Sequence, residues 1–370
     1  MSNKVIWLTD RTRIVTDWQC PRKRYLNYHA EGRGLVSADL KLELFLGIII
    51  HDSLAAIAFQ HQSGSVDIDL IASTAGQQVK EALENRGPEF CNEQSTLVEG
   101  LIRGFYRHVW PRLMAQYPKI IAIEQEMSYD INKDIRFMSR PDLILESPDG
   151  EWAYIEYKST GSKREEWVAQ WTTAVQVHST IKAVEATLGQ APSTVIVQGL
   201  YKGFSNYGKL NSPIVYGYLR QGQPPFSKDE FSYEYKKGFF RAPIWTLPGG
   251  VKQWIENMPP EVLADQFPQT PPIFVKDALV EAFFRQRIVR ETEIRMALDM
   301  KEQMKSPADQ QAILDGSFPQ NWGACNTGYG TGCEYRPVCH GRLENPLSSG
   351  YELREPHHDA EMESLDNAQS

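Results

Sequence analysis

The 370-residue chain has no uninterrupted apolar stretch that approaches the roughly 18 residues of a membrane-spanning helix, so no such helix is expected. Its first residues lack the apolar core of a secretory signal, and the cytoplasm is therefore the expected location. Positive charge is not in excess. The net charge of −8 argues against a surface coated for nucleic acid, although it leaves room for a local basic groove.

Two further absences concern chemistry. No GxxxxGK[ST] loop occurs, which excludes a P-loop helicase motor on this chain. There are only five cysteines, and disulfides are disfavoured in the expected compartment. Three cluster as Cys325-x7-Cys333-x5-Cys339, one is Cys20, and Cys91 is expected to be a free thiol. Four thiolates suit either a tetrahedral zinc site or an iron–sulfur cluster. Spacing alone neither distinguishes these nor shows that Cys20 joins the other three.

The order of expected elements indicates an α/β protein with a central mixed β-sheet flanked by helices. Helices are expected at about 12–30, 40–61, 70–86, 95–117, 163–188 and 277–304. Strands are expected at about 119–129, 135–146, 151–158, 194–201, 213–220 and 231–236. We divide the chain into a helical N-terminal part (1–118), a core (119–245), a helical and cysteine-bearing segment (246–345) and an acidic, disordered tail (346–370).

Residues 139–158 carry the strongest local signal, a predicted hairpin around Pro148-Asp149-Gly150. A type I turn closed by a left-handed glycine would pair Ser147 with Glu151, and counting outward sets Asp142 opposite Glu156. Side chains alternate along a strand, so Lys158 points the same way as Glu156.

Two carboxylates and an ammonium on otherwise apolar strands need partners, because an isolated buried charge is costly. Carboxylates suit Mg²⁺ or Mn²⁺, which can clamp the attacking and leaving oxygens of a phosphodiester, with Lys158 beside the reacting group. The alternative is a cross-strand salt-bridge cluster on an exposed sheet face, which the apolar neighbours and the adjoining Arg140-Pro141 make less favourable.

The pair Pro141-Asp142 followed by Glu156-Tyr157-Lys158 resembles the signature of the PD-(D/E)XK nucleases, which have a restriction-endonuclease-like core. The segment from Gly47 to His51 is similar to the GxxxH helix motif of the RecB-like branch. In that branch the motif histidine joins the metal site, so the resemblance implies that His51, Asp142 and Glu156 bind metal. Gln176 fits the first position of that branch's QxxxY motif and would help to position substrate, although Thr180 stands where the tyrosine is expected. On the preceding strand Glu124 and Glu126 could add a carboxylate, and Glu126 is favoured.

The cysteines resemble those of AddB-like and CRISPR-adaptation nucleases, in which one cysteine before the core and three after it hold a [4Fe–4S] cluster. The resemblance thus assigns Cys20, Cys325, Cys333 and Cys339 to one cluster, with zinc as the alternative. Seven residues separate the first C-terminal pair where the family commonly has two, and this glycine-rich insert is expected to bulge outward. We expect the cluster to be structural, because it ties the two ends of the chain together.

The combined hypothesis is a metal-dependent DNA exonuclease of the two-metal type that acts on single strands or ends. It would act in recombination, repair or CRISPR-type DNA processing, together with a helicase or with a recombination or adaptation protein. The sequence does not determine whether the protein forms an oligomer. The rival is a catalytically silent iron–sulfur DNA-binding or scaffold subunit of a recombination complex. Basic residues that could contact DNA phosphates follow Cys20 and open the helix after the active-site strand, namely Arg22, Lys23, Arg24, Lys163 and Arg164.

Overall fold

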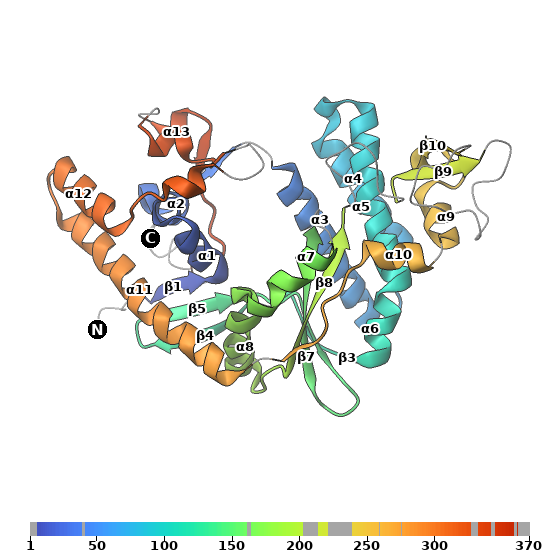
Figure 1. Ribbon diagram of the computed structural model, residues 1–370, viewed down its shortest axis with the longest axis horizontal. Helices are drawn as coiled ribbons and strands as arrows, with labels where there is room; N and C mark the ends of the chain where they lie inside the picture. Colours follow the sequence, from blue (N-terminus) through green and yellow to red (C-terminus); the bar gives the residue numbers. More distant parts are fainter. Residues whose placement is uncertain are drawn as a thin grey trace.

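A computed structural model describes most of the chain. The described residues are 6–38, 41–160, 164–202, 214–220, 239–258, 260–274, 276–326, 332–341, 345–358 and 361. The strand expected at 231–236 lies outside them. The α/β class is confirmed, because helices cover both faces of a central mixed sheet (Figure 1).

The central sheet has five strands in the order β11-β8-β7-β6-β3. Only β7 and β8 run parallel; the other neighbours are antiparallel. A second sheet has the order β1-β5-β4, and two pairs, β2 with β12 and β9 with β10, complete the described strands. The strand bounds are β1 (Trp7–Asp10), β2 (Leu35–Ser37), β3 (Lys119–Ile123), β4 (Met127–Asn132), β5 (Ile135–Ser139), β6 (Leu143–Glu146), β7 (Trp152–Thr160), β8 (Thr194–Tyr201), β9 (Tyr216–Arg220), β10 (Phe239–Pro243), β11 (Ile273–Phe274) and β12 (Tyr351–Leu353).

Alternation along the hairpin strands divides the core in two. Leu143 and Ile155 point to the face covered by α3, α5 and α6, whereas Ile144 and Tyr154 point to the face covered by α8 and α11. The helix bounds are α1 (Arg11–Gln19), α2 (Pro21–Tyr28), α3 (Leu42–Gln62), α4 (Ile68–Ala82), α5 (Pro88–His108), α6 (Trp110–Gln116), α7 (Arg164–Ala169), α8 (Val175–Leu188), α9 (Gly250–Asn257), α10 (Pro260–Gln266), α11 (Asp277–Gln303), α12 (Pro307–Ser317) and α13 (Arg336–Cys339).

A third apolar cluster lies under the two ends of the chain. It joins α2, β2, the second half of α11, α12 and β12, and we call this part the cysteine lobe; its buried residues are Tyr25, Leu26, Ala30, Leu35, Ile294, Ala297, Leu314, Phe318, Tyr335 and Tyr351. In Figure 1 the lobe stands on the opposite side of the central sheet from α4 and α5. The site described below lies between them, at the end of the sheet.

Several elements differ from the sequence-based expectation. The helix expected at 12–30 is broken at Cys20, whose extended backbone separates α1 from α2, and Pro21 starts the second helix. Asp10 caps α1 by accepting a hydrogen bond of 2.8 Å from the Arg13 N–H. Asp17, near the end of the same helix, forms an ion pair with Arg290.

The helix that carries the GxxxH motif is continuous through Gly47. Among the described helices, α3 is the one long and apolar enough to cross a membrane by length and composition alone. Its buried residues belong to the core shared with α4 and α5, and its first half borders the cleft described below. The apolar residues of α3 are therefore accounted for by packing against α4 and α5 and by their position at the border of the cleft.

The tail expected to be disordered is ordered over the described residues 345–358 and at Glu361. Strand β12 pairs with β2, and the Arg354 side chain donates hydrogen bonds to the backbone and side chain of Asn27. His358 is buried. The acidic composition did not predict these contacts, because each depends on a partner in a distant part of the chain.

Candidate active site

The hairpin of β6 and β7 has the register expected from its turn. Gly150 is left-handed (φ +83°), and the Ser147 N–H donates to the Glu151 carbonyl at 2.9 Å. Leu143 pairs with Ile155, so Asp142, one residue before β6, falls beside Glu156. The turn thus fixes which carboxylates meet.

Asp142 and Glu156 are both buried, and each has its own partners. The Tyr157 N–H donates to Asp142 Oδ2 at 2.5 Å. Glu156 forms an ion pair with Lys158 and accepts a hydrogen bond from the Tyr154 hydroxyl. Arg11, at the start of α1, reaches Glu156 with 3.4 Å between Nη1 and Oε1.

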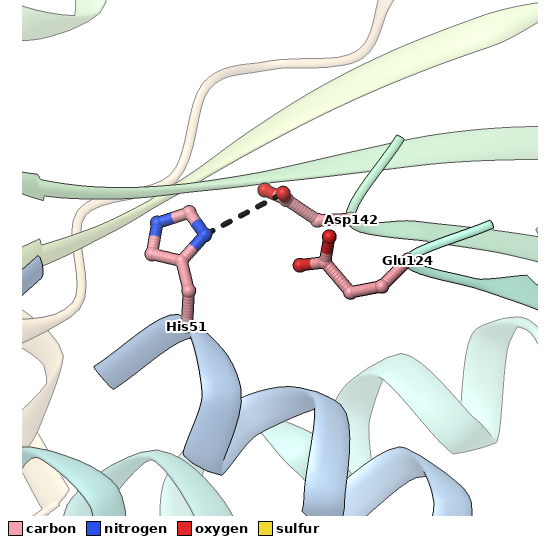
Figure 2. A group of neighbouring side chains, drawn as sticks. All are labelled: His51, Glu124 and Asp142. Carbon is pink, nitrogen blue, oxygen red and sulfur yellow. Dashed lines mark ion pairs between the residues drawn. The ribbon is translucent and has the colours of Figure 1, made fainter. Parts of the chain in front are cut away.

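His51 enters from α3. Its Nδ1 lies 3.5 Å from Asp142 Oδ1, and Figure 2 shows the imidazole and the carboxylates of Asp142 and Glu124 directed toward one another. One ligand atom from each of the three residues lies within 4.8 Å of the others. An imidazole with two carboxylates is a donor set that fits Mn²⁺ or Mg²⁺, so the residues fit a divalent ion.

The third metal-ligand candidate is Glu124, whereas the sequence favoured Glu126. Strand β3 ends at Ile123, and Glu124 adopts a left-handed backbone (φ +45°) while its N–H donates to the Asp142 carbonyl at 3.2 Å. Strand alternation would place Glu124 and Glu126, two residues apart, on the same face, so it could not choose between them. The left-handed residue Glu124 follows the end of β3, and the two side chains have different partners. Glu126 instead lies 2.8 Å from His358 and 3.5 Å from Arg140.

The four ionisable groups do not share one protonation behaviour. Burial raises the pKa of Glu124 to about 8, and the Asp142 carboxylate adds to the effect. Burial and Asp142 likewise raise the pKa of Glu156. For Asp142 burial acts in the same direction, but His51 and Lys158 outweigh it and lower the pKa. Burial opposes protonation of His51, yet Asp142 raises its pKa. Without a cation, the Glu124 carboxyl is therefore protonated at neutral pH, and a cation that binds there must displace its proton.

We expect Mn²⁺ binding to the DNA-free protein to release protons and to tighten as the pH rises from about 6 to about 8, because Glu124 must ionise first. The raised pKa of Glu124 also implies that the free energy of unfolding of the metal-free protein falls as the pH rises from the ordinary pKa of 4.5 to about 8. Over this range the unfolded chain ionises Glu124 more readily than the folded protein does. Calorimetric titration at several pH values measures both the affinity and the protons released.

Glu124→Gln should make the pH dependence of Mn²⁺ affinity shallower, since one displaced proton is removed. The matched control is Glu151→Gln, on the exposed hairpin loop. An unchanged slope in Glu124→Gln would show that Glu124 does not bind the ion.

The cluster opens into a cleft of about 560 Å³. Its walls come from the start of α1, the first half of α3, the strand ends and the tail, and they include Leu44, Ile48, Arg140, Thr180 and His357. Leu44 and Ile48 are 62% and 52% exposed, so apolar surface borders a charged centre.

The QxxxY position on α8 is only partly described. Gln176 lies one turn before Thr180 on this helix. Thr180 borders the cleft, and its hydroxyl lies 3.0 Å from that of Ser139. The residue that replaces the expected tyrosine thus supports the wall through a short hydrogen bond.

The four cysteines predicted to act together line one pocket of about 760 Å³ between α1, α13 and the segment before it. Burial raises the pKa of Cys339, and the other three thiols add to the effect, which places their charges near one another. The Asn321 N–H donates to Cys20 Sγ at 3.4 Å, and the Cys333 N–H donates to the Cys325 carbonyl at 3.0 Å. Cys91 is buried elsewhere, with its thiol donating to the Leu83 carbonyl.

The basic residues after Cys20 do not face the cleft. Arg24 is fully buried and forms an ion pair with Glu291. Arg22 binds the Phe318 carbonyl and Asp315, while Lys23 borders the cysteine pocket. The sequence analysis predicted that these residues contact DNA phosphates. In the structure, the partners of Arg22 and Arg24 lie inside the cysteine lobe instead. Lys163 lies outside the described residues, and Arg164 is the first residue of α7.

The cleft also contains residues that were not identified from the sequence, among them Arg11, Tyr154 and His358. Tyr154 could have been found, since it lies two positions before Glu156 on the same strand and so on the same face. Arg11 and His358 come from the two ends of the chain and gave no local signal.

Comparison with family models supplies an independent result. Residues 12–340 match the model described as the PD-(D/E)XK nuclease superfamily, and comparison with curated proteins gives no match. The matched range contains His51, the hairpin and all four clustered cysteines. It covers most of the chain, and the mixed α/β fold agrees with a restriction-endonuclease-like core. The chain therefore belongs to the PD-(D/E)XK nuclease superfamily, whose members are metal-dependent phosphodiester hydrolases acting on DNA.

Proposed function

We propose that the protein is a DNA exonuclease that acts on single strands or exposed ends. The observation that carries this proposal is the cleft wall: Leu44 and Ile48 lie exposed beside the metal-ligand residues. Unpaired bases present apolar faces that such side chains can contact, whereas a duplex stacks those faces against one another. Nothing in the described fold resembles a base-reading helix, so sequence-independent binding is expected.

Each residue of the site has a proposed role. His51, Glu124 and Asp142 would hold Mg²⁺ or Mn²⁺, which supplies Lewis-acid neutralisation of the phosphate when bound. Lys158 donates hydrogen bonds to the scissile phosphate or orients the attacking water. Glu156, whose pKa is raised by burial and by Asp142, would accept a proton from the attacking water. Because both Asp142 and Glu156 border the cleft, we extend the proposal to a two-metal type.

We propose that the four cysteines hold a [4Fe–4S] cluster rather than zinc. A tetrahedral zinc site sets its sulfurs about 3.8 Å apart, given bonds of ~2.3 Å. Among the described residues, three ligand atoms within 4.8 Å of one another are found at the His51 group and not at the cysteines, so no three of the sulfurs are that close. A cuboidal cluster, in which each iron takes its own thiolate, suits this wider spacing.

We propose that the protein acts in recombination, repair or CRISPR-type DNA processing. The sequence printed above carries no P-loop, and a separate helicase is the partner we propose for unwinding. The rival proposal is a silent iron–sulfur scaffold subunit. The complete set of Asp142, Glu156 and Lys158 favours the nuclease. Burying the two carboxylates costs desolvation free energy, and a protein without catalytic activity would gain nothing from keeping them.

Digestion of end-labelled DNA tests the exonuclease proposal. Single-stranded and double-stranded substrates, each with free or blocked termini, are incubated with Mg²⁺ or Mn²⁺. We expect rapid loss of single strands with free ends and little cleavage of blocked circles. Equal cleavage of circular and linear substrates would show an endonuclease instead, and complete inactivity on every substrate would favour the scaffold.

A further inference from the structure

Both arms of the chain that leave the cysteine pocket end at the nuclease cleft. One arm is α1, which runs from Cys20 at its C-terminal end back to Arg11 at its first residue. The other follows Cys339 through β12 to His357 and His358, which line the cleft. We call the end of this second arm, residues 351–358 together with Glu361, the strap.

The strap is fastened to α1 at the cleft by two contacts. The His358 imidazole lies between carboxylates, with Nε2 3.2 Å from Asp10 Oδ2 and Nδ1 2.8 Å from Glu126 Oε2. Glu361 forms an ion pair with Arg13 and accepts hydrogen bonds from the backbone N–H groups of His357 and His358. These contacts tie the strap, α1 and the segment after β3 together.

Asp10 links this fastening to Arg11. Asp10 is the N-cap of α1 and is buried, so the position of its carboxylate sets where the helix begins. Arg11 is the next residue, and its guanidinium extends into the cleft as far as Glu156 while the side chain stays 35% exposed. A shift of Asp10 would therefore carry Arg11 away from the site.

We propose that Arg11 contacts the substrate phosphate and that His358 is a positioning residue that holds Arg11 in the cleft through Asp10. The inference rests on the proposed nuclease function. Glu156 accepts bonds from Arg11, Lys158 and Tyr154 in the DNA-free protein, so Arg11 is one of several donors there and is free to transfer to a phosphate oxygen. Guanidinium groups bind phosphate through two parallel hydrogen bonds, a geometry that a lysine does not reproduce.

A double-mutant cycle on DNA degradation tests the coupling. Arg11→Gln should lower kcat/KM about tenfold to a hundredfold, mainly through KM, as expected for loss of a charge-assisted hydrogen bond. It should also reduce the salt dependence of KM by about one phosphate contact. His358→Ala should give a similar loss, and the double variant should be no worse than Arg11→Gln alone.

Controls separate positioning from folding. His358→Gln keeps an amide that can donate to both carboxylates and should restore most activity, whereas Glu352→Ala, exposed on β12, should behave as wild type. Losses that multiply in the double variant, or an unchanged KM in Arg11→Gln, would overturn the inference. The nuclease proposal would still stand in that case, provided that the wild type degrades DNA. An inactive wild type would instead refute the nuclease proposal and this inference with it.

Discussion

Asp142→Asn is expected to lower kcat/KM for DNA by about a thousandfold while the fold persists. The change keeps the size of the side chain and one acceptor oxygen for the Tyr157 N–H, but it removes the charge that pairs with His51 and would bind the cation. A catalytic metal supplies several kcal/mol of charge stabilisation, and ~4 kcal/mol corresponds to about a thousandfold in rate. Initial rates on end-labelled single strands with Mg²⁺ or Mn²⁺ measure the effect.

Lys158→Ala should reduce kcat by about a hundredfold to a thousandfold with a smaller change in KM, because its ammonium is expected to stabilise charge formed only in the transition state. Asp149→Asn and Lys133→Ala are the matched controls, since both residues are exposed on turns, Asp149 between β6 and β7 and Lys133 between β4 and β5 of the second sheet. Circular dichroism checks that each variant is folded. Full activity in Asp142→Asn or Lys158→Ala would exclude these residues from the reaction.

The part of the site that the sequence predicted is the part that local geometry determines. Two residues of a hairpin are placed by the turn between them, so the meeting of Asp142 with Glu156 followed from Gly150 and alternation alone. His51 was different: a helix residue 91 positions before Asp142 has no register with it, and only the resemblance to a family motif brought it to the site.

The residues that were missed depend on breaks in regular structure or on contacts between distant segments. Strand alternation puts Glu124 and Glu126 on one face and could not choose between them, whereas the left-handed residue Glu124 after β3 leaves the two side chains with different partners. His358 was assigned to a disordered tail because composition describes a segment on average, whereas burial of one imidazole between two carboxylates depends on tertiary packing. Neither feature has a signature within its own stretch of sequence.

Cys20→Ser is expected to abolish the metal cofactor and to lower the melting temperature by about 10 °C. The cysteines lie at opposite ends of the chain, and closing a loop of about 300 residues costs ~5 kcal/mol of chain entropy, which the proposed metal–thiolate bonds would offset. A melting temperature changes by roughly 2 °C per kcal/mol in a protein of this size, so loss of the bonds gives the expected shift. Differential scanning calorimetry of the purified variant measures it.

Cys91→Ser is the matched control, because its thiol lies outside the cysteine pocket and a hydroxyl can still donate to the Leu83 carbonyl. Metal analysis of the wild type distinguishes the cofactors: iron with acid-labile sulfide and a brown colour indicates the cluster, and a colourless zinc protein indicates a site of four thiolates around one zinc ion. If an oxidised, cluster-free wild type melts at the same temperature as the intact protein, the cluster does not stabilise the fold. The cysteine lobe would then be held by its own apolar core of Tyr25, Leu35 and Phe318.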